Sequence, residues 1–144
     1  MNDLKARAIR LLARREHSRA ELARKLAADG TQEDIEAVLA ELTASGLLSD
    51  ARYAEAYLRG NAARFGAAKL RQTLRAKGIA GELVEEQLAA ADTPDELSRA
   101  REIWARKFGT TPADAREWAR QARFLQSRGF SADVIRKLLK DPEA

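Results

Sequence analysis

Hydrophobic residues recur through the chain at the three- and four-residue spacing of amphipathic helices. No segment alternates polar and apolar residues as a half-buried strand does. The β-branched aliphatic residues that favour strands are scarce, with three valines and five isoleucines beside abundant Ala, Leu, Arg and Glu. The pattern therefore predicts an all-α protein. The helical spacing is seen in Ile35, Val38, Leu39 and Leu42, and again in Ile135, Leu138 and Leu139.

The periodic segments, and the polar or glycine-containing breaks between them, predict nine helices. Because helix ends fray, each bound holds to within a few residues. The expected helices cover residues 2–15, 18–29, 31–45, 50–64, 66–77, 80–91, 94–107, 112–128 and 131–140.

Residues that cap helix N-termini precede several of these segments. Ser18 with Glu21, and Thr93 with Glu96, have the spacing of capping boxes. Pro94 would then occupy the first helical position, where its missing N–H costs nothing. These signals predict where the helices begin. Further N-cap candidates are Thr31, Asp50, Ser131 and Thr111, which Pro112 follows in a repeat of the Thr-Pro pattern.

Six of the eight glycines stand where a periodic segment stops, as glycines do just after a helix C-terminus. Three of these six also mark an internal repeat, because each has a leucine four residues before it and an aliphatic residue five residues after it. The spacings between the three are 48 and 51 residues. The six are Gly30, Gly46, Gly66, Gly78, Gly109 and Gly129, and the repeat aligns Gly30, Gly78 and Gly129.

The repeat predicts three tandem three-helix units, at residues 1–48, 49–92 and 93–144. Each unit is too small to bury a good core alone, so neighbouring units are expected to pack on one another in an elongated array, either straight or curved. A tetratricopeptide array would need a 34-residue period with two helices per unit, and neither occurs.

Composition excludes several kinds of chemistry. The chain has no cysteine, so it has no disulfide, thiolate nucleophile or zinc–sulfur site, and His17 is the sole imidazole. No run of six apolar residues occurs, and the first residues lack the apolar core of a signal peptide, so we expect no membrane span and a cytoplasmic location.

No catalytic, cofactor-binding or metal site is predicted. His17 lies just before a helix cap without an evident partner, and we interpret it as a surface turn residue. The acidic residues gather on segments that we interpret as solvated helix faces. No phosphate-binding loop of the Walker type is present. We therefore expect a protein that is not an enzyme and uses no cofactor.

Charge is distributed in blocks along the chain, although the net charge is only +4. Residues 29–50 and 80–98 contain six acidic residues each and no Lys or Arg, whereas residues 51–79 and 99–140 are strongly basic. A nucleic acid or a protein of mixed charge suits such a surface, and solubility with helix-dipole compensation explains it equally well. The eight aromatic residues fall at helical spacing on apolar faces, which favours core anchoring over base stacking.

Several motifs occur in order at separated places in the chain. RREHSRAEL at residues 14–22, GLLSDARYAEAY at 46–57 and KGI at 77–79 are followed by RKF at 106–108 and RFLQSRGFS at 123–131. Taken together, these motifs resemble those of the RecX family, whose members regulate the RecA recombinase. The resemblance covers nearly the whole chain.

The resemblance implies three tandem three-helix repeats, in agreement with the glycine-anchored repeat. It further implies a non-enzymatic, mainly negative regulator in DNA repair, homologous recombination and the SOS response. Such a protein binds the groove of the RecA filament on single-stranded DNA, blocks extension, promotes disassembly, and so inhibits ATP hydrolysis, strand exchange and co-protease activity. We expect a monomer, with weak nonspecific nucleic-acid affinity as a secondary property.

Our hypothesis for the contact residues comes from charge alone. Lys69, Arg71, Arg75 and Lys77 crowd one predicted helix, and Arg71 and Arg75 form an outward i, i+4 pair. We expect RecA-filament or DNA contacts from the basic residues of the middle and last repeats. They are Arg52, Arg64, Lys69, Arg71, Arg75, Lys77, Arg120, Arg123, Arg128, Arg136 and Lys137.

Two other functions stay open at this point. A helix-turn-helix-like DNA-binding protein without a recombinase partner would bind duplex DNA with a steep salt dependence. A plain helical scaffold would neither bind DNA nor act on a recombinase.

Overall fold

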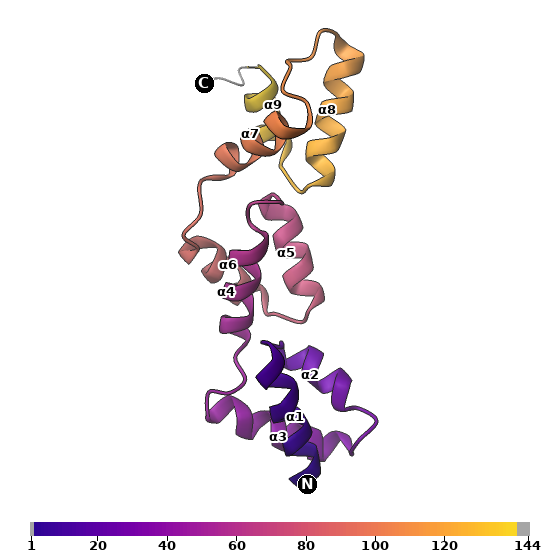
Figure 1. The fold of residues 1–144 in the computed structure, drawn as a ribbon, viewed down its shortest axis with the longest axis vertical. Coiled ribbons are helices and arrows are strands. Elements are labelled where there is room, and N and C mark those ends of the chain that lie inside the picture. Colours follow the sequence, from indigo (N-terminus) through magenta and orange to yellow (C-terminus); the bar gives the residue numbers. More distant parts are fainter. Residues whose placement is uncertain (1, 141–144) are drawn as a thin grey trace. The chain divides into compact units, whose positions relative to one another are not determined.

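The computed structural model describes residues 2–140, and in this part of the chain every regular element is an α-helix. The prediction of an all-α protein is confirmed, and each expected helix is present with its ends shifted by at most a few residues. The helices are α1 (Asn2–Arg14), α2 (Arg19–Leu26), α3 (Gln32–Ala44), α4 (Asp50–Asn61), α5 (Ala67–Ala76), α6 (Gly81–Ala90), α7 (Glu96–Lys107), α8 (Ala115–Ser127) and α9 (Ala132–Lys140) (Figure 1). None of these helices is long and apolar enough to cross a lipid bilayer.

The helix caps follow the sequence signals in part. Ser18 and Glu21 form the predicted capping box at the start of α2, and Thr31 caps α3. Ser131 accepts a hydrogen bond from the Val134 amide at the start of α9, as an N-cap residue does.

Three of the predicted caps are wrong. Asp95, rather than Thr93, caps α7, and Asp114, rather than Thr111, caps α8. In each case an aspartate lies between the Thr-Pro pair and the helix, and aspartate is a better N-cap than threonine. Asp50 lies inside α4, where Ser49 accepts the hydrogen bond from the Arg52 amide.

Four of the six glycines predicted to end helices have the expected left-handed backbone: Gly46, Gly78, Gly109 and Gly129. For Gly78 and Gly129 the hydrogen bonds are those of a Schellman motif, because the next amide donates to a carbonyl five residues earlier. Gly30 and Gly66 have no positive φ and lie four and five residues after the last residues of α2 and α4, so the prediction that they directly follow a helix C-terminus is wrong.

The chain divides into two compact units whose boundaries fall inside helices. One unit contains residues up to 57 together with 74–89, and the other contains residues 58–73 together with those from 90 onward. The three dividing positions therefore lie within α4, within α5 and before the last residue of α6. The predicted boundaries of the three repeats, after residues 48 and 92, stay a prediction.

In the first unit, α1, α2 and α3 pack around a leucine-rich core. Leu22, Leu26 and Leu39 are fully buried there. His17 is also buried, with 1% of its surface exposed, so our interpretation of it as a surface turn residue is wrong. Its Nδ1 donates to the Arg15 carbonyl oxygen, and its Nε2 accepts from the Lys25 ammonium group. This pattern requires a neutral ring, and burial lowers the pKa of His17 accordingly.

In the second unit, α7, α8 and α9 pack around Trp104, Leu125 and Leu138. Core anchoring by aromatic residues is confirmed for Trp104 and Phe130, which are 7% and 2% exposed. The Trp104 indole donates to the buried amide oxygen of Gln121, at 2.8 Å, so this core contains a satisfied polar pair.

A close approach of two backbone segments joins the beginning of α5 to the loop between α8 and α9. The Gly66 amide donates to the Arg128 carbonyl oxygen at 2.7 Å, and the Ala68 amide donates to that of Gly129 at 3.2 Å. A Cβ atom on Gly129 would lie 2.6 Å from the Lys69 amide nitrogen, and one on Gly66 would overlap the Gly129 carbonyl group. Only glycine fits at both positions.

We predict that Gly129→Ala destabilises the protein by at least about 2 kcal/mol, because it adds left-handed strain to a steric overlap. Gly60 provides the matched control, since it lies inside α4 with open space around its Cα. Gly60→Ala should stabilise the protein by roughly 0.5–1 kcal/mol. Urea unfolding followed by circular dichroism measures both effects, and an unchanged midpoint for Gly129→Ala would contradict the close approach.

The buried carboxylate of Glu21 predicts a specific loss of stability in acid. Its two oxygens accept from Arg15, at 3.2 and 2.8 Å, and these bonds are the main reason that its pKa falls from 4.5 to about 2. The unfolded chain therefore binds this proton more readily than the folded one does. The stabilisation is complete above pH 4.5 and is lost as the pH falls through about 2.

We predict that between pH 6 and pH 2 the wild-type protein loses up to about 3 kcal/mol more stability than Glu21→Gln does. Glu86→Gln, at an exposed position on α6, should instead follow the wild-type pH dependence. Urea midpoints measured across this pH range test the prediction, and parallel curves for wild type and Glu21→Gln would refute it.

Candidate functional site

Three half-buried phenylalanines of the second unit each have a cationic side chain over the ring. Phe108 is the C-cap residue of α7, Phe124 lies on the third turn of α8, and Phe65 precedes α5. The Phe108 and Phe124 rings meet edge to face, with centroids 5.5 Å apart. These rings therefore make cation–π contacts at the surface as well as packing contacts, a role that our interpretation of the aromatic residues as core anchors did not include.

The cations and rings form one continuous series. Arg120 lies over Phe108, 5.0 Å from its centroid, and Lys107 lies over Phe124 at 5.3 Å. Arg128 is shared, at 5.2 Å from the Phe124 centroid and 5.8 Å from that of Phe65. Arg64 completes the series over Phe65, at 5.4 Å. A cation over a ring contributes about 0.5–1 kcal/mol at an exposed site, so the series holds its cations in place.

An open hollow of about 400 Å³ lies beside Phe124, and we call it the Phe124 hollow. Four of its six lining residues are cationic, and the other two are Phe124 and the core residue Ile103. No carboxylate lines it. The four cationic residues are Arg64, Arg106, Lys107 and Arg128.

A polar network holds Arg120, the cation that lies over Phe108 at one end of the series. Glu117 accepts two hydrogen bonds from the Arg120 guanidinium group, at 2.9 and 2.7 Å, and one from the Gln121 amide at 3.1 Å. These bonds, with that of Arg120 first, lower the pKa of Glu117 to about 2. Glu117 therefore stays ionised and fixes Arg120 over Phe108, while Gln121 ties the network to the Trp104 indole.

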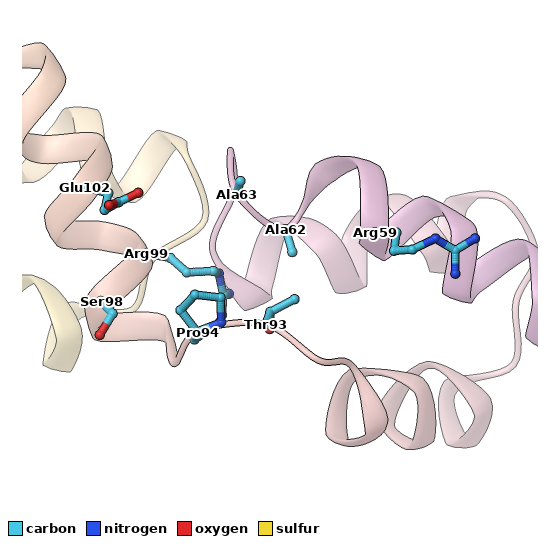
Figure 2. Close-up of a pocket in the computed structure, with 8 residues that line it drawn as sticks. All are labelled: Arg59, Ala62, Ala63, Thr93, Pro94, Ser98, Arg99 and Glu102. Carbon is cyan, nitrogen blue, oxygen red and sulfur yellow. The ribbon is translucent and has the colours of Figure 1, made fainter.

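A second, smaller cavity of about 240 Å³ lies between the end of α4 and the first turns of α7 (Figure 2). Arg59, Ser98 and Arg99 line it, and so does the carboxylate of Glu102. Arg99 donates to the Pro94 carbonyl oxygen, but its buried Nε has no hydrogen-bond partner among the described residues. The cavity thus combines cations with an anion and is less suited than the Phe124 hollow to bind an acidic partner.

No group of three Asp, Glu or His side chains in residues 2–140 is placed to hold a metal ion. The candidate functional surface of the described chain is the Phe124 hollow together with its series of rings and cations.

The predicted site residues of the middle repeat do not form one cluster. Arg52 has a structural role, because it pairs with Glu16 and donates to the carbonyl oxygens of Gly46 and Leu47. Arg71 and Arg75 are exposed on α5, and Lys69 is half-buried against Gly129. The backbone carbonyl of Lys77 accepts a hydrogen bond from the Ser18 hydroxyl group. Of this group only Arg64 reaches the Phe124 hollow.

The predicted site residues of the last repeat form two pairs and one separate residue. Arg120 and Arg128 belong to the series of rings and cations. Arg136 and Lys137 are exposed on α9 and lie 3.8 and 3.4 Å from the Asp133 carboxylate. Arg123 is exposed on α8.

Our residue hypothesis omitted Arg106 and Lys107, which line the Phe124 hollow beside Arg64 and Arg128. The sequence did contain a signal for them, since they directly precede Phe108 at the end of a predicted helix. That signal is a pair of cationic residues directly beside an aromatic residue. The net charge of each segment does not distinguish these two residues from the other basic ones.

Comparison with known proteins identifies three family domains in order along the chain. Residues 5–42 match the first three-helix domain of RecX, residues 49–88 match the second, and residues 94–139 match the third.

Similar proteins match over almost their full length. The chain is 56% identical over 138 residues to Regulatory protein RecX of Leptothrix cholodnii, covering 95% of this chain and 87% of that protein. It is 47% identical over 137 residues to Regulatory protein RecX of Chromobacterium violaceum, covering 94% and 88%.

Solved structures show the same fold. The crystal structure of RecX from Lactobacillus salivarius matches with a TM-score of 0.82 at 22% identity, over 97% of this chain and 94% of that one. A second crystal structure of regulatory protein RecX matches with a TM-score of 0.79 at 26% identity, over 97% and 74%. With three tandem three-helix domains and relatives of this similarity, the chain belongs to the RecX family of regulatory proteins.

Proposed function

We propose that this protein is a mainly negative regulator of the RecA recombinase in the cytoplasm. Membership of the RecX family carries the proposal, through 56% identity over 138 residues to a regulatory protein of that family. The protein binds the groove of the RecA filament on single-stranded DNA, blocks extension and promotes disassembly. ATP hydrolysis, strand exchange and co-protease activity fall as a result. It does this as a monomer, without catalysis or a cofactor.

The distribution of charge supports a partner of acidic or mixed charge. The predicted contact residues that remain exposed on α5, α8 and α9 present guanidinium and ammonium groups to solvent. Such groups steer association and fix register on a charged surface. Arg52 contributes less, because its guanidinium group already bonds to Glu16 and to two carbonyl oxygens.

Titration of the protein into RecA on single-stranded DNA, followed by ATP hydrolysis, tests the proposal. We expect inhibition at ratios well below one protein per recombinase monomer, because blocking an end or breaking one contact affects many protomers. Absence of an effect in excess would refute it, and salt-steep binding to duplex DNA would then favour the helix-turn-helix alternative.

A charge-reversal variant of helix α5 tests whether this helix contacts the filament. Arg71 and Arg75 are suitable positions because they are exposed and lie one turn apart. We predict that the charge reversal Arg71→Glu/Arg75→Glu raises the concentration needed for half-inhibition by about tenfold, since each reversed contact costs roughly 1 kcal/mol or less.

The matched control is Arg10→Glu/Arg14→Glu, which makes the same charge change one turn apart at exposed positions of α1. Both variants should keep wild-type helicity by circular dichroism. Equal inhibition by the two variants would remove α5 from the interface.

A further inference from the structure

We infer that the Phe124 hollow is a phosphate-binding site of this chain that works without the recombinase. Its ligand is the phosphate of a nucleotide or of a nucleic-acid strand, held by Arg106 and Lys107 together with Arg64 and Arg128. The inference goes beyond the proposed function, because it assigns a direct ligand to a defined group of residues.

The first argument is the imbalance of charge. No carboxylate pairs with any of the four cations in the described chain. Arg64 donates to the Asn61 side-chain oxygen and Arg128 to the Arg64 carbonyl oxygen, and both acceptors are neutral. Elsewhere in the chain exposed cations do pair with acids, as Arg136 does with Asp133. The hollow thus brings like charges together, and a bound anion relieves their repulsion.

The second argument is preorganisation. Arg128 is held by two rings and by a carbonyl oxygen, and Lys107 is held over Phe124. A side chain that is already ordered loses less conformational entropy when it binds a ligand. The close approach of Gly66 and Gly129 also helps to fix the positions of Arg64 and Phe65, because these two residues directly precede Gly66.

The third argument concerns the kind of anion. Three of the four cations are arginines, whose planar fork matches phosphate oxygens, and consecutive phosphates supply the charge density that four cations in about 400 Å³ require. The apolar surfaces of Ile103 and Phe124 offer contact to a sugar or a base. The cavity at Arg99 does not have this excess of positive charge, because Glu102 also lines it.

The test omits the recombinase altogether. Binding of a fluorescently labelled oligothymidylate of about 15 nucleotides is followed by anisotropy at several salt concentrations. We predict that Arg106→Gln/Lys107→Gln weakens binding by about tenfold at low salt and reduces the slope of log K against log salt by about 1.4.

The matched control is Arg116→Gln/Lys140→Gln, which removes two charges from exposed positions of the same unit, outside the hollow and outside the predicted contact residues. It should keep near-wild-type affinity. Equal weakening by both variants would overturn the site, because it would show that only the overall charge matters. Circular dichroism of each variant checks that the helices persist.

Competition identifies the source of the phosphate. Displacement of the strand by tripolyphosphate alone supports the shared phosphate chemistry, and displacement by ATP at a concentration similar to that of strand nucleotides identifies a free nucleotide as the ligand. If the oligothymidylate binds and both tripolyphosphate and ATP compete only weakly with it, the ligand is a nucleic-acid strand.

Two outcomes would overturn the inference. One is no binding of any of these phosphates. The other is stronger competition by polyglutamate than by tripolyphosphate, which would identify the hollow as a site for carboxylates of a protein partner. Neither outcome bears on inhibition of RecA, so the failure of this inference and of the proposed function are distinguishable.

Discussion

The candidate site depends on the contact of Gly66 with Gly129. Two backbone segments that are 63 positions apart approach so closely that a Cβ atom on either glycine would overlap the other segment. Two backbone hydrogen bonds then hold the start of α5 against the loop that follows α8. Because Phe65 directly precedes Gly66, this contact places its ring under the Arg128 guanidinium group. Without the contact, the series of rings and cations would end at Phe124.

The same side chains that complete the core also organise the charged surface. Phe108 and Phe124 contact the buried cluster around Trp104, yet both remain half-buried and present a ring to a cation. A leucine at either place would supply similar packing but no favourable electrostatic contact with a cation. The surface is therefore built on rigid elements, as a binding site that must order long basic side chains requires.

The helices were predictable from the sequence because burial acts on every turn and so leaves a repeated signal. Single contacts leave no such signal. The burial of His17 beside Lys25 was therefore not predicted, and neither was the ion pair of Arg52 with Glu16, because sequence spacing does not show which distant residues meet in space. The caps of α7 and α8 failed for a local reason, since Asp95 and Asp114 compete with the threonines upstream. The hollow combines residues from the α4–α5 loop, α7 and α8, so charge counting identified only Arg64 and Arg128 among its cations.

The position of the unit boundaries has a consequence for how such a protein changes in length over time. Duplication or loss of one sequence repeat is usually harmless in a solenoid, because each repeat contacts only equivalent neighbours. Here residues 58–73 pack in one compact unit with the chain from residue 90 onward, and Gly66 has a specific partner in the last repeat. An extra repeat inserted between them would separate that pair. The packing thus disfavours the gain of a whole repeat between residues 66 and 129.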